Sequence, residues 1–257
     1  MWREIARQLP SEDTLYLADQ AHVPYGSRSL TEVRGFSEEI TRFLLGKGAK
    51  IIVVACNTAS AAALHHLRHA FPQTPFVGME PAVKPAVERT HADGVGVIAT
   101  QATFQGELFS SLAERYAGEV KVLTQICPGL VEAVEAGELE TAGTDAILRT
   151  CLAPLIDAGI DQLVLGCTHY PFLRPAIERV VGRGVNVIDP GPAVARQTGH
   201  VLVQRGLETS GETPGDHGFY TTGDAKSLRR MIQVLMPECG EQTEVRPARW
   251  KGNSLEG

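Results

Sequence analysis

The chain has 257 residues, a net charge of −6, 43% hydrophobic and 21% charged residues. That length allows one large domain or two smaller ones with a real core, and the absence of any basic run argues against nucleic acid as a primary partner. No apolar stretch reaches the length of a membrane span, and the amino-terminal residues do not resemble a signal peptide. The five cysteines are irregularly spaced, which argues against a disulfide framework and favours a reducing cytoplasm.

Strands and helices are predicted to alternate along most of the chain. The candidate strands are apolar runs rich in valine and isoleucine, which is typical of a parallel sheet covered on both faces. They lie at 14–18, 50–55, 75–79, 94–100, 120–126, 162–166 and 185–189. Helical patterns lie between them, at 30–46, 58–70, 82–91, 104–116, 129–137, 144–158, 172–181 and 192–206. This alternation predicts right-handed crossovers and an α/β fold.

The pattern changes after the last of these helices. The segments HGFYTTG (217–223) and TEVRPARW (243–250) read as edge strands around a short helix near 225–236. Glycine and proline lie between the elements rather than inside them, as turn residues should. The last seven residues, KGNSLEG, are expected to be frayed.

Two passages place a cysteine directly after an apolar strand. Cys56 follows KIIVVA, and Cys167 follows QLVLG about half a chain length later. Ligands bind at the carboxyl ends of strands in open parallel sheets, so an internal repeat predicts two half-molecules that present their thiols to one cleft. The repeat also predicts a missing element: GVGVIATQAT precedes Cys167, but the same spacing counted back from Cys56 falls ahead of Met1.

The two cysteines suit proton transfer. A helix N-terminus favours the reactive thiolate, and each cysteine is followed by polar residues, Asn57-Thr58 and Thr168-His169, that can cap a helix or bind a ligand carboxylate. To invert a stereocentre, a thiolate can take a proton from one face while a thiol delivers one to the other. The remaining cysteines, at 127, 151 and 239, lack this context and are expected to be small core residues.

At these residues the chain resembles the glutamate racemases, cofactor-independent enzymes of the aspartate/glutamate racemase superfamily. The resemblance covers almost the whole chain in the family's order, and CTHYPFL is its most specific part. The matching motifs are ADQAHVPYG (18–26), VACNTAS (54–60), GMEPA (78–82), GVIATQAT (96–103), CPGLVEAVEAGEL (127–139) and LGCTHYPFL (165–173).

The resemblance implies two similar α/β domains with the active site between them, at residues 1–92 plus 195–257 and at 93–194. It implies that Cys56 and Cys167 are catalytic, the first serving D-glutamate and the second L-glutamate, and that Asp19, Glu135 and His169 assist them. The substrate-binding residues that it implies are Tyr25, Gly26, Asn57, Thr58, Thr100, Thr103, Thr168 and His169.

The implied function is racemisation of glutamate, L to D, supplying D-glutamate for peptidoglycan in the cytoplasm without a cofactor or metal. The implied partner is the small-molecule substrate, with no membrane or nucleic acid partner, and family members often form homodimers. Two alternatives stay open. One is a racemase for aspartate or another amino acid. The other is a non-catalytic amino-acid-binding or regulatory protein, favoured if the short amino terminus is genuine.

The chain departs from the family at its start. The family begins with a strand ending in Asp-Ser-Gly and a glycine-rich turn, whereas MWREI aligns with the helix that follows. A start assigned too late would explain this, and we expect that explanation to hold. A real truncation would leave the neighbours of an inner strand with unpaired backbone groups, and we would then expect weak activity and poor stability.

Several residues have simpler explanations when taken alone. Asp19 could only begin a turn, and Glu135 could be an exposed helix residue. His65, His66 and His69 fit a solvated helix face better than a metal site, because they lack further ligands. Cys167 and His169 could form a hydrolase dyad, but around a strand–helix corner they need not face each other, and no oxyanion donor is identifiable.

Overall fold

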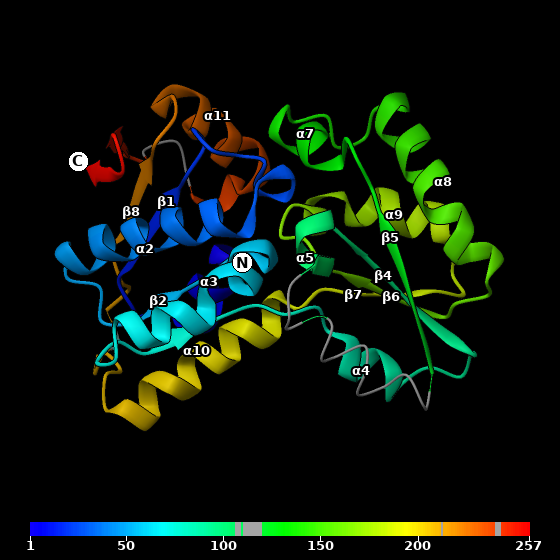
Figure 1. The fold of residues 1–257 in the computed structure, drawn as a ribbon, viewed down its shortest axis with the longest axis horizontal. Helices are drawn as coiled ribbons and strands as arrows, with labels where there is room; N and C mark the ends of the chain where they lie inside the picture. Colours follow the sequence, from blue (N-terminus) through cyan, green and yellow to red (C-terminus); the bar gives the residue numbers. More distant parts are fainter. Residues whose placement is uncertain (106–108, 110–119, 212, 240–242) are drawn as a thin grey trace.

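Parallel β-sheets flanked by helices form two lobes that lie side by side in the computed structural model (Figure 1). The structure describes residues 1–105, 109, 120–211, 213–239 and 243–257. Within these residues, no helix combines the length and the apolar character that crossing a bilayer requires.

The second lobe contains one four-stranded parallel sheet. Its strand order is β5 (Lys121–Ile126), β4 (Gly94–Ala99), β6 (Gln162–Leu165) and β7 (Asn186–Ile188). Every residue of β4 is buried, as expected for an inner parallel strand covered on both faces. One face packs against α7 (Leu130–Glu135), α8 (Ala142–Asp157) and α9 (Arg174–Val181), and the other packs against α4 (Val83–Val87).

The first lobe contains two separate parallel sheets. One has the order β1 (Thr14–Ala18), β8 (His217–Thr221) and β9 (Val245–Pro247), and the other pairs β2 (Ile52–Val53) with β3 (Phe76–Val77). Among the described residues, β1 and β2 do not pair with each other.

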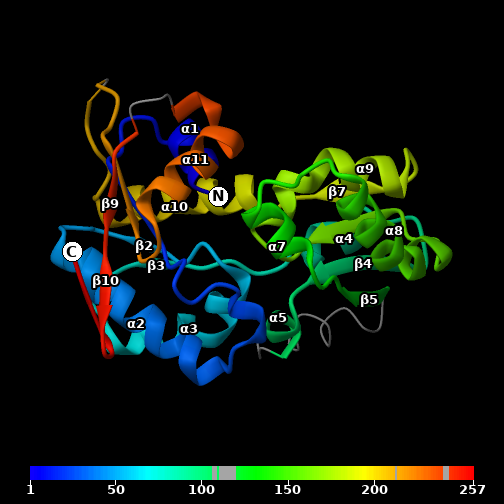
Figure 2. The same cartoon turned by 90° about the horizontal axis from the view of Figure 1, so that it is seen from above.

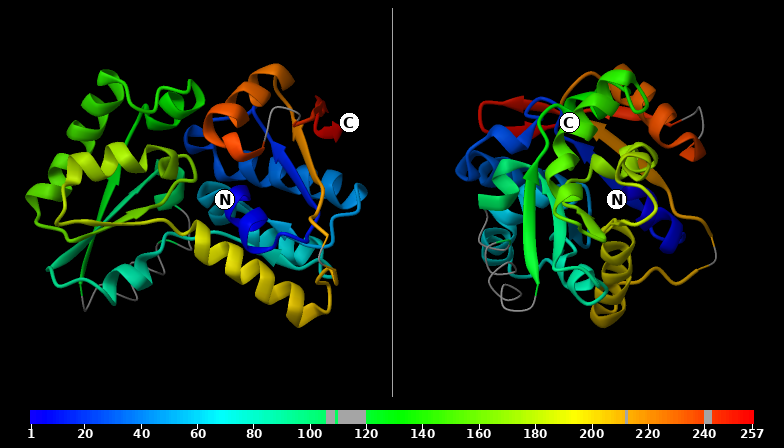
Figure 3. Two further views of the ribbon diagram at one scale, coloured as in Figure 1. Left: turned by 180° about the vertical axis from the view of Figure 1, so that it is seen from behind. Right: turned by 90° about the vertical axis from the view of Figure 1, so that its right-hand side faces the viewer.

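Helices cover the strands of the first lobe from two sides (Figure 2). On one side lie α2 (Leu30–Gly46) and α3 (Asn57–Ala70), and on the other lie α1 (Trp2–Gln8), α10 (Gly191–Arg205) and α11 (Ala225–Leu235). The view from behind shows α1 against α10 (Figure 3). The strands are thus enclosed by helices on both faces, as in the second lobe.

Local sequence signals fix the ends of several helices. Ser29 and Glu32 form a reciprocal capping box, in which each side chain accepts the other residue's backbone N–H at the start of α2. At the other end of a helix, α10 stops at Gly206, whose φ of 61° lies in the left-handed region that a glycine adopts without strain.

The predicted α/β fold is confirmed, and each predicted strand up to residue 189 is present, although β2 and β3 are shorter than expected. The helix expected at 82–91 shortens to α4, and the one expected at 172–181 begins as a 3-10 turn, η2 (Tyr170–Leu173), that runs into α9. The helix predicted at 104–116 lies mostly outside the described residues, where α5 (Gln101–Gln105) precedes the gap. The residue limits of the two domains stay a prediction.

Two expectations about the chain were wrong. Cys127 and Cys151 are buried in the core as predicted, but they form a disulfide that was not expected, with their Cα atoms 5.5 Å apart, because the end of β5 and α8 pack into the same core. The last residues are not frayed: β10 (Arg249–Lys251) and β11 (Ser254–Glu256) form an antiparallel hairpin, with Gly252 at a φ of 58° in its turn.

Candidate active site

A cavity of about 270 Å³ lies at the carboxyl ends of the strands and is lined by residues of both lobes. Both Cys56 and Cys167 line it, so the two thiols predicted to face one cleft do share one. Nine other predicted site residues also line it: Asp19, Tyr25, Gly26, Asn57, Thr58, Thr100, Glu135, Thr168 and His169. The structure therefore gathers residues that are spread over most of the sequence.

Thr103 is the one predicted site residue that does not line this cavity. It is buried behind it and shares a ring of hydroxyl hydrogen bonds with Thr58 (3.1 Å) and Thr100 (3.0 Å), which are themselves 2.8 Å apart. Thr58 belongs to the first lobe, and Thr100 and Thr103 belong to the second. The three hydroxyls therefore join the lobes at one edge of the cavity.

Gly26 allows a second close approach between the lobes. A Cβ atom added at this position would lie 2.7 Å from Cβ of Thr100, which is closer than real Cβ contacts come. The 3-10 turn η1 (Tyr25–Ser27) can therefore reach the second lobe only with a glycine at this position.

Cys56 is the N-cap residue of α3, and its Sγ atom accepts the backbone N–H of Ala59 at 3.4 Å. Burial raises the pKa of this thiol, the Ala59 hydrogen bond lowers it, and the nearby charge of Cys167 raises it, with a net result of about 11. The lowering of the pKa that a helix N-terminus favours is therefore outweighed at Cys56 by the loss of hydration. At neutral pH Cys56 is a thiol.

Cys167 has a different environment, in which His169 links it to Glu135. The Nδ1 atom of His169 lies 3.7 Å from Sγ of Cys167, and its Nε2 atom lies 2.7 Å from Oε1 of Glu135. Burial lowers the pKa of His169, but its hydrogen bonds to Cys167 and Glu135 outweigh that effect and raise the pKa to about 10. The imidazolium of His169 therefore places a positive charge beside the sulfur of Cys167.

The contacts among Cys167, His169 and Glu135 answer two questions that the sequence left open. Cys167 and His169 do face each other, contrary to the objection raised against a Cys–His pair. Glu135 is not a freely exposed helix residue, because it ends α7 beside the cavity and is paired with His169.

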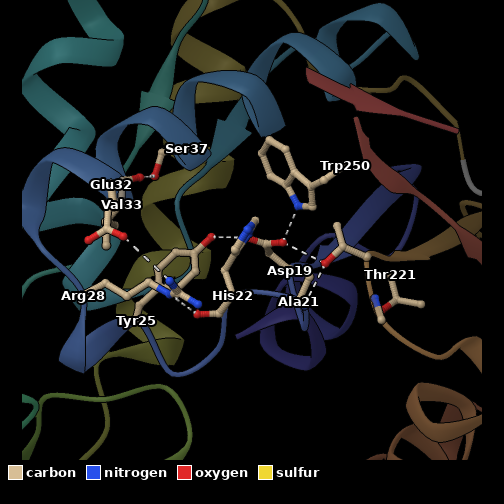
Figure 4. A network of polar contacts seen from close by, with 12 residues as sticks. Asp19, Ala21, His22, Tyr25, Arg28, Glu32, Val33, Ser37, Thr221 and Trp250 are labelled. Carbon is tan, nitrogen blue, oxygen red and sulfur yellow. Dashed lines mark hydrogen bonds and ion pairs between the residues drawn. The ribbon is translucent and has the colours of Figure 1, made fainter. Parts of the chain in front are cut away.

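Asp19 lies at the end of β1 and is surrounded by four side chains (Figure 4). Its Oδ1 atom accepts hydrogen bonds from the Thr222 hydroxyl (2.7 Å) and the Trp250 indole N–H (2.9 Å). Its Oδ2 atom accepts from the Tyr25 hydroxyl at 2.7 Å and lies 2.9 Å from Nδ1 of His22. The carboxylate is thus held by the protein's own polar groups, and its direct effect is on Tyr25.

Tyr25 is held as a neutral phenol by this arrangement. Burial raises its pKa, and the negative charge of Asp19 raises it further. The hydroxyl of this predicted substrate-binding tyrosine therefore donates its hydrogen bond to the Asp19 carboxylate and not to a group in the cavity.

Asn57 differs from its neighbours because its side chain has no partner. It is 3% exposed and lines the cavity, and neither its amide nitrogen nor its amide oxygen has a hydrogen-bond partner among the described residues. Buried polar groups are nearly always paired, so an unpaired amide in a cavity marks a place where a ligand's polar groups fit.

Three residues around Asp19 were not singled out by the sequence: His22, Thr222 and Trp250. His22 lies inside the motif ADQAHVPYG, which could have pointed to it. Trp250 is 231 positions from Asp19 in the chain, and no local pattern could have joined the two.

Two histidines on α3 bind neighbouring protein groups. His66 pairs with Glu38 at 2.6 Å, and the ring of His69 bonds the backbone oxygen of His65. Among the residues that the structure describes, no group of three or more metal-ligating side chains comes together anywhere.

Comparison with known proteins gives a consistent result. A family model described as Asp/Glu/Hydantoin racemase matches residues 1–198. The chain is 47% identical over 236 residues to a glutamate racemase of Stutzerimonas stutzeri, covering 92% of this chain and 89% of the relative. It is 48% identical over 233 residues to a glutamate racemase of Pseudomonas aeruginosa, covering 91% and 88%.

Solved structures agree with these relatives. A glutamate racemase isoform of Bacillus anthracis superposes with a TM-score of 0.86 at 31% identity, covering 98% of this chain and 93% of that one. An Escherichia coli glutamate racemase, in complex with L-glutamate and the activator UDP-MurNAc-ala, gives a TM-score of 0.84 at 28% identity, covering 98% and 94%.

Proposed function

The chain belongs to the Asp/Glu/hydantoin racemase family, and on that premise we propose that it interconverts L- and D-glutamate with two cysteines acting on opposite faces of the substrate. One observation carries the proposal: Cys56 and Cys167 come from different lobes and line the same cavity. A single carbon held between them is accessible to one sulfur on each side.

The protonation of the two sites fits the L-to-D direction. The imidazolium of His169, whose pKa is raised to about 10, lies beside the sulfur of Cys167. Cys56, with a pKa of about 11, begins as a thiol. Cys167 therefore takes the α-proton of L-glutamate, and Cys56 delivers its proton to the opposite face of the carbanionic centre.

The numbers of protons removed and delivered are equal over one turnover. The C–H bond of the substrate breaks as an S–H bond forms on Cys167, while the S–H bond of Cys56 breaks as the new C–H bond forms. The site then holds a thiol at Cys167 and a thiolate at Cys56, which is the state that accepts D-glutamate. Exchange with water restores the starting state.

The polar residues around the thiols hold the rest of the substrate. The unpaired amide of Asn57 can accept from the ammonium group and donate to a carboxylate, and Thr58 and Thr168 lie next to the two cysteines. Asp19 and Glu135 act through neighbours: Asp19 positions Tyr25, and Glu135 keeps His169 charged. The predicted roles of Gly26, Thr100 and Thr103 are to shape the wall where the lobes meet.

The proposal also covers the localisation, the domain limits and the oligomeric state of the enzyme. The enzyme acts in the cytoplasm, where its product enters peptidoglycan synthesis. Its domains comprise residues 1–92 plus 195–257 and residues 93–194. It forms a homodimer.

The direct test is to incubate the chain with L-glutamate and, separately, with L-aspartate, and to separate the enantiomers by chiral chromatography. The proposal predicts D-glutamate, with aspartate turned over at least about tenfold more slowly. Equal or greater turnover of aspartate would assign a different substrate. Binding of glutamate without turnover in a folded chain would point to a non-catalytic binding protein.

A further inference from the structure

The loop between β1 and α2, residues 19–29, forms one wall of the candidate active site. Tyr25 and Gly26 of this loop line the cavity, and Gly26 approaches Thr100 of the second lobe. The only regular element in the loop is the short turn η1, so side-chain contacts largely determine where it lies. The shape of this wall therefore depends on the residues that hold the loop.

Asp19 is the centre of these contacts (Figure 4). One carboxylate oxygen bonds two residues of the loop, the Tyr25 hydroxyl and Nδ1 of His22. The other oxygen accepts from Thr222 and from the indole N–H of Trp250, which lie outside the loop. The carboxylate is only 8% exposed, so it depends on these four partners instead of water. A donor lost from the outer oxygen therefore also loosens the hold of Asp19 on the loop.

Trp250 contacts the loop a second time, through the face and edge of its ring. Its centroid lies 5.0 Å from the His22 ring in an edge-on contact and 5.6 Å from the ring of Phe36 on α2. The His22 ring is itself stacked on Phe36 at 3.8 Å. Aromatic rings in such arrangements stabilise one another beyond their buried area. One side chain of β10 thus fixes both Asp19 and the neighbouring His22.

The hairpin that carries Trp250 is attached away from the cavity. Leu255 of β11 packs with Phe43 of α2 and Tyr220 of β8, and Lys47 donates to the carbonyl of Gly257. Trp250 does not line the cavity, and neither does the rest of the hairpin. Any effect of Trp250 on a molecule in the cavity therefore passes through Asp19 and the loop.

We propose that Trp250 is a positioning residue for the racemisation: it holds Asp19 and His22, and through them the wall of the cavity that carries Tyr25 and Gly26. This inference rests on the proposed function. Proton transfer depends on other contacts, because the row of Cys167, His169 and Glu135 lies within the second lobe. Loss of the indole therefore weakens substrate binding more than it slows the chemical step.

The test compares Trp250→Phe with Trp2→Phe in the full chain. Trp2→Phe is a matched control, because it removes the same indole N–H from a bond to Thr14 at the opposite end of β1 from Asp19. A third and a fourth variant, Asp19→Ala with and without Trp250→Phe, show whether the effect of Trp250 passes through Asp19. Each variant is measured for kcat and KM with L-glutamate, for Tm, and for hydrogen exchange in peptides that cover residues 19–28.

Trp250→Phe is expected to raise KM at least about fivefold with kcat changed less than about twofold, and to speed exchange in the loop at least about fivefold. Trp2→Phe is expected to leave KM and the exchange of the loop at their wild-type values. In the Asp19→Ala background, Trp250→Phe should change KM less than about twofold. If Asp19→Ala does not fold, the comparison of the two tryptophan variants decides alone.

Three results would overturn the proposal: an unchanged KM in Trp250→Phe, a fall in kcat without a rise in KM, or a full KM effect that persists in Asp19→Ala. A lower Tm alone would assign Trp250 to the fold and would equally overturn it. Hydrogen exchange needs no turnover, so it reports whether Trp250 holds the loop even if wild type does not racemise glutamate. Failure of this inference and failure of the proposed function are therefore distinguishable.

Discussion

The imidazole of His169 lies 2.7 Å from the carboxylate of Glu135, and its other ring nitrogen points at the sulfur of Cys167. Cys56, in the same cavity, instead accepts the backbone N–H of Ala59, and burial raises the pKa of its thiol to about 11. The two halves of a repeated fold thus give their cysteines different surroundings, which suits a reaction that needs one base and one acid.

Replacing Glu135 by glutamine is expected to move the alkaline limb of the pH–rate profile to lower pH. The pKa of His169 is raised to about 10, partly by Glu135, so its positive charge is lost as pH rises through that value. The neutral amide stabilises the imidazolium less, and the charge is then lost at lower pH. The profile of kcat/KM for L-glutamate measures this shift, and an unchanged alkaline limb in Glu135→Gln would contradict it.

The pairing of His169 with Glu135 also makes the free energy of unfolding depend on pH. Because the folded pKa of His169 lies above its ordinary value, its contribution to the free energy of unfolding is complete below about pH 6.5 and disappears as pH rises through about 10. Urea unfolding at a series of pH values should therefore show wild type losing stability between these limits relative to His169→Gln. Parallel curves for the two proteins would show that the shift is absent.

Alkylation of Cys56 is expected to accelerate about tenfold for each pH unit between 7 and 10, because only the thiolate reacts and its pKa is about 11. The measurement uses iodoacetamide on the Cys167→Ser variant, with the labelled site read by peptide mass spectrometry. In that variant the plot of alkylation rate against pH should lie at slightly lower pH than in wild type, because the charge of Cys167 also raises the pKa of Cys56. A rate that levels off near pH 8 would mean that the helix N-terminus dominates after all.

Substituting Asn57 by leucine is expected to raise KM for glutamate at least about tenfold without lowering Tm. Its buried amide has no partner among the described residues, so an apolar side chain of similar size removes a polar group that the fold does not use. Thermal unfolding and steady-state kinetics on the same sample make the comparison. A large loss of stability with unchanged KM would assign Asn57 to the fold instead of the substrate.

The two tryptophans of the chain allow a hydrogen bond to a charged group to be compared with one to a neutral group. Trp250 donates its indole N–H to the Asp19 carboxylate at 2.9 Å, and Trp2 donates to the Thr14 hydroxyl at 2.8 Å. Hydrogen bonds to charged groups contribute about 1.5–3 kcal/mol, against about 0.5–1.5 kcal/mol for neutral ones. Trp250→Phe is therefore expected to cost more unfolding free energy than Trp2→Phe in chemical denaturation. The opposite order would show that Asp19 does not depend on Trp250.

Most of the architecture could be predicted because it depends on local patterns. The apolar runs gave the strands of both lobes, and the strand–cysteine–polar sequence gave the place of Cys56 and Cys167 at the carboxyl ends of two of them. The Cys127–Cys151 disulfide was missed because it joins segments that are 24 residues apart. The two strands of the carboxyl-terminal hairpin are neighbours in sequence, but Leu255 packs with Phe43 of the distant α2, which a local pattern does not reveal.

The candidate site was harder to predict where burial decides its chemistry. The thiol state of Cys56 follows from loss of hydration, which the helix-start signal at Asn57 does not reveal. The contact between Trp250 and Asp19 needs the carboxyl-terminal residues to return to the first lobe. Sequence motifs therefore located the reacting groups, while their protonation and support required the folded chain.

The central claim is that two sulfurs serve opposite faces of one carbon, and isotope exchange tests it most directly. L-glutamate is incubated with the enzyme in D₂O, and both enantiomers are recovered after the first few per cent of conversion. The two-thiol account predicts α-deuterium in the newly formed D-glutamate and almost none in the recovered L-glutamate, because the proton delivered to the product comes from the solvent-exchanged Cys56. Deuterium accumulating in the recovered L-glutamate as fast as D-glutamate forms would show a single group acting on both faces and would contradict it.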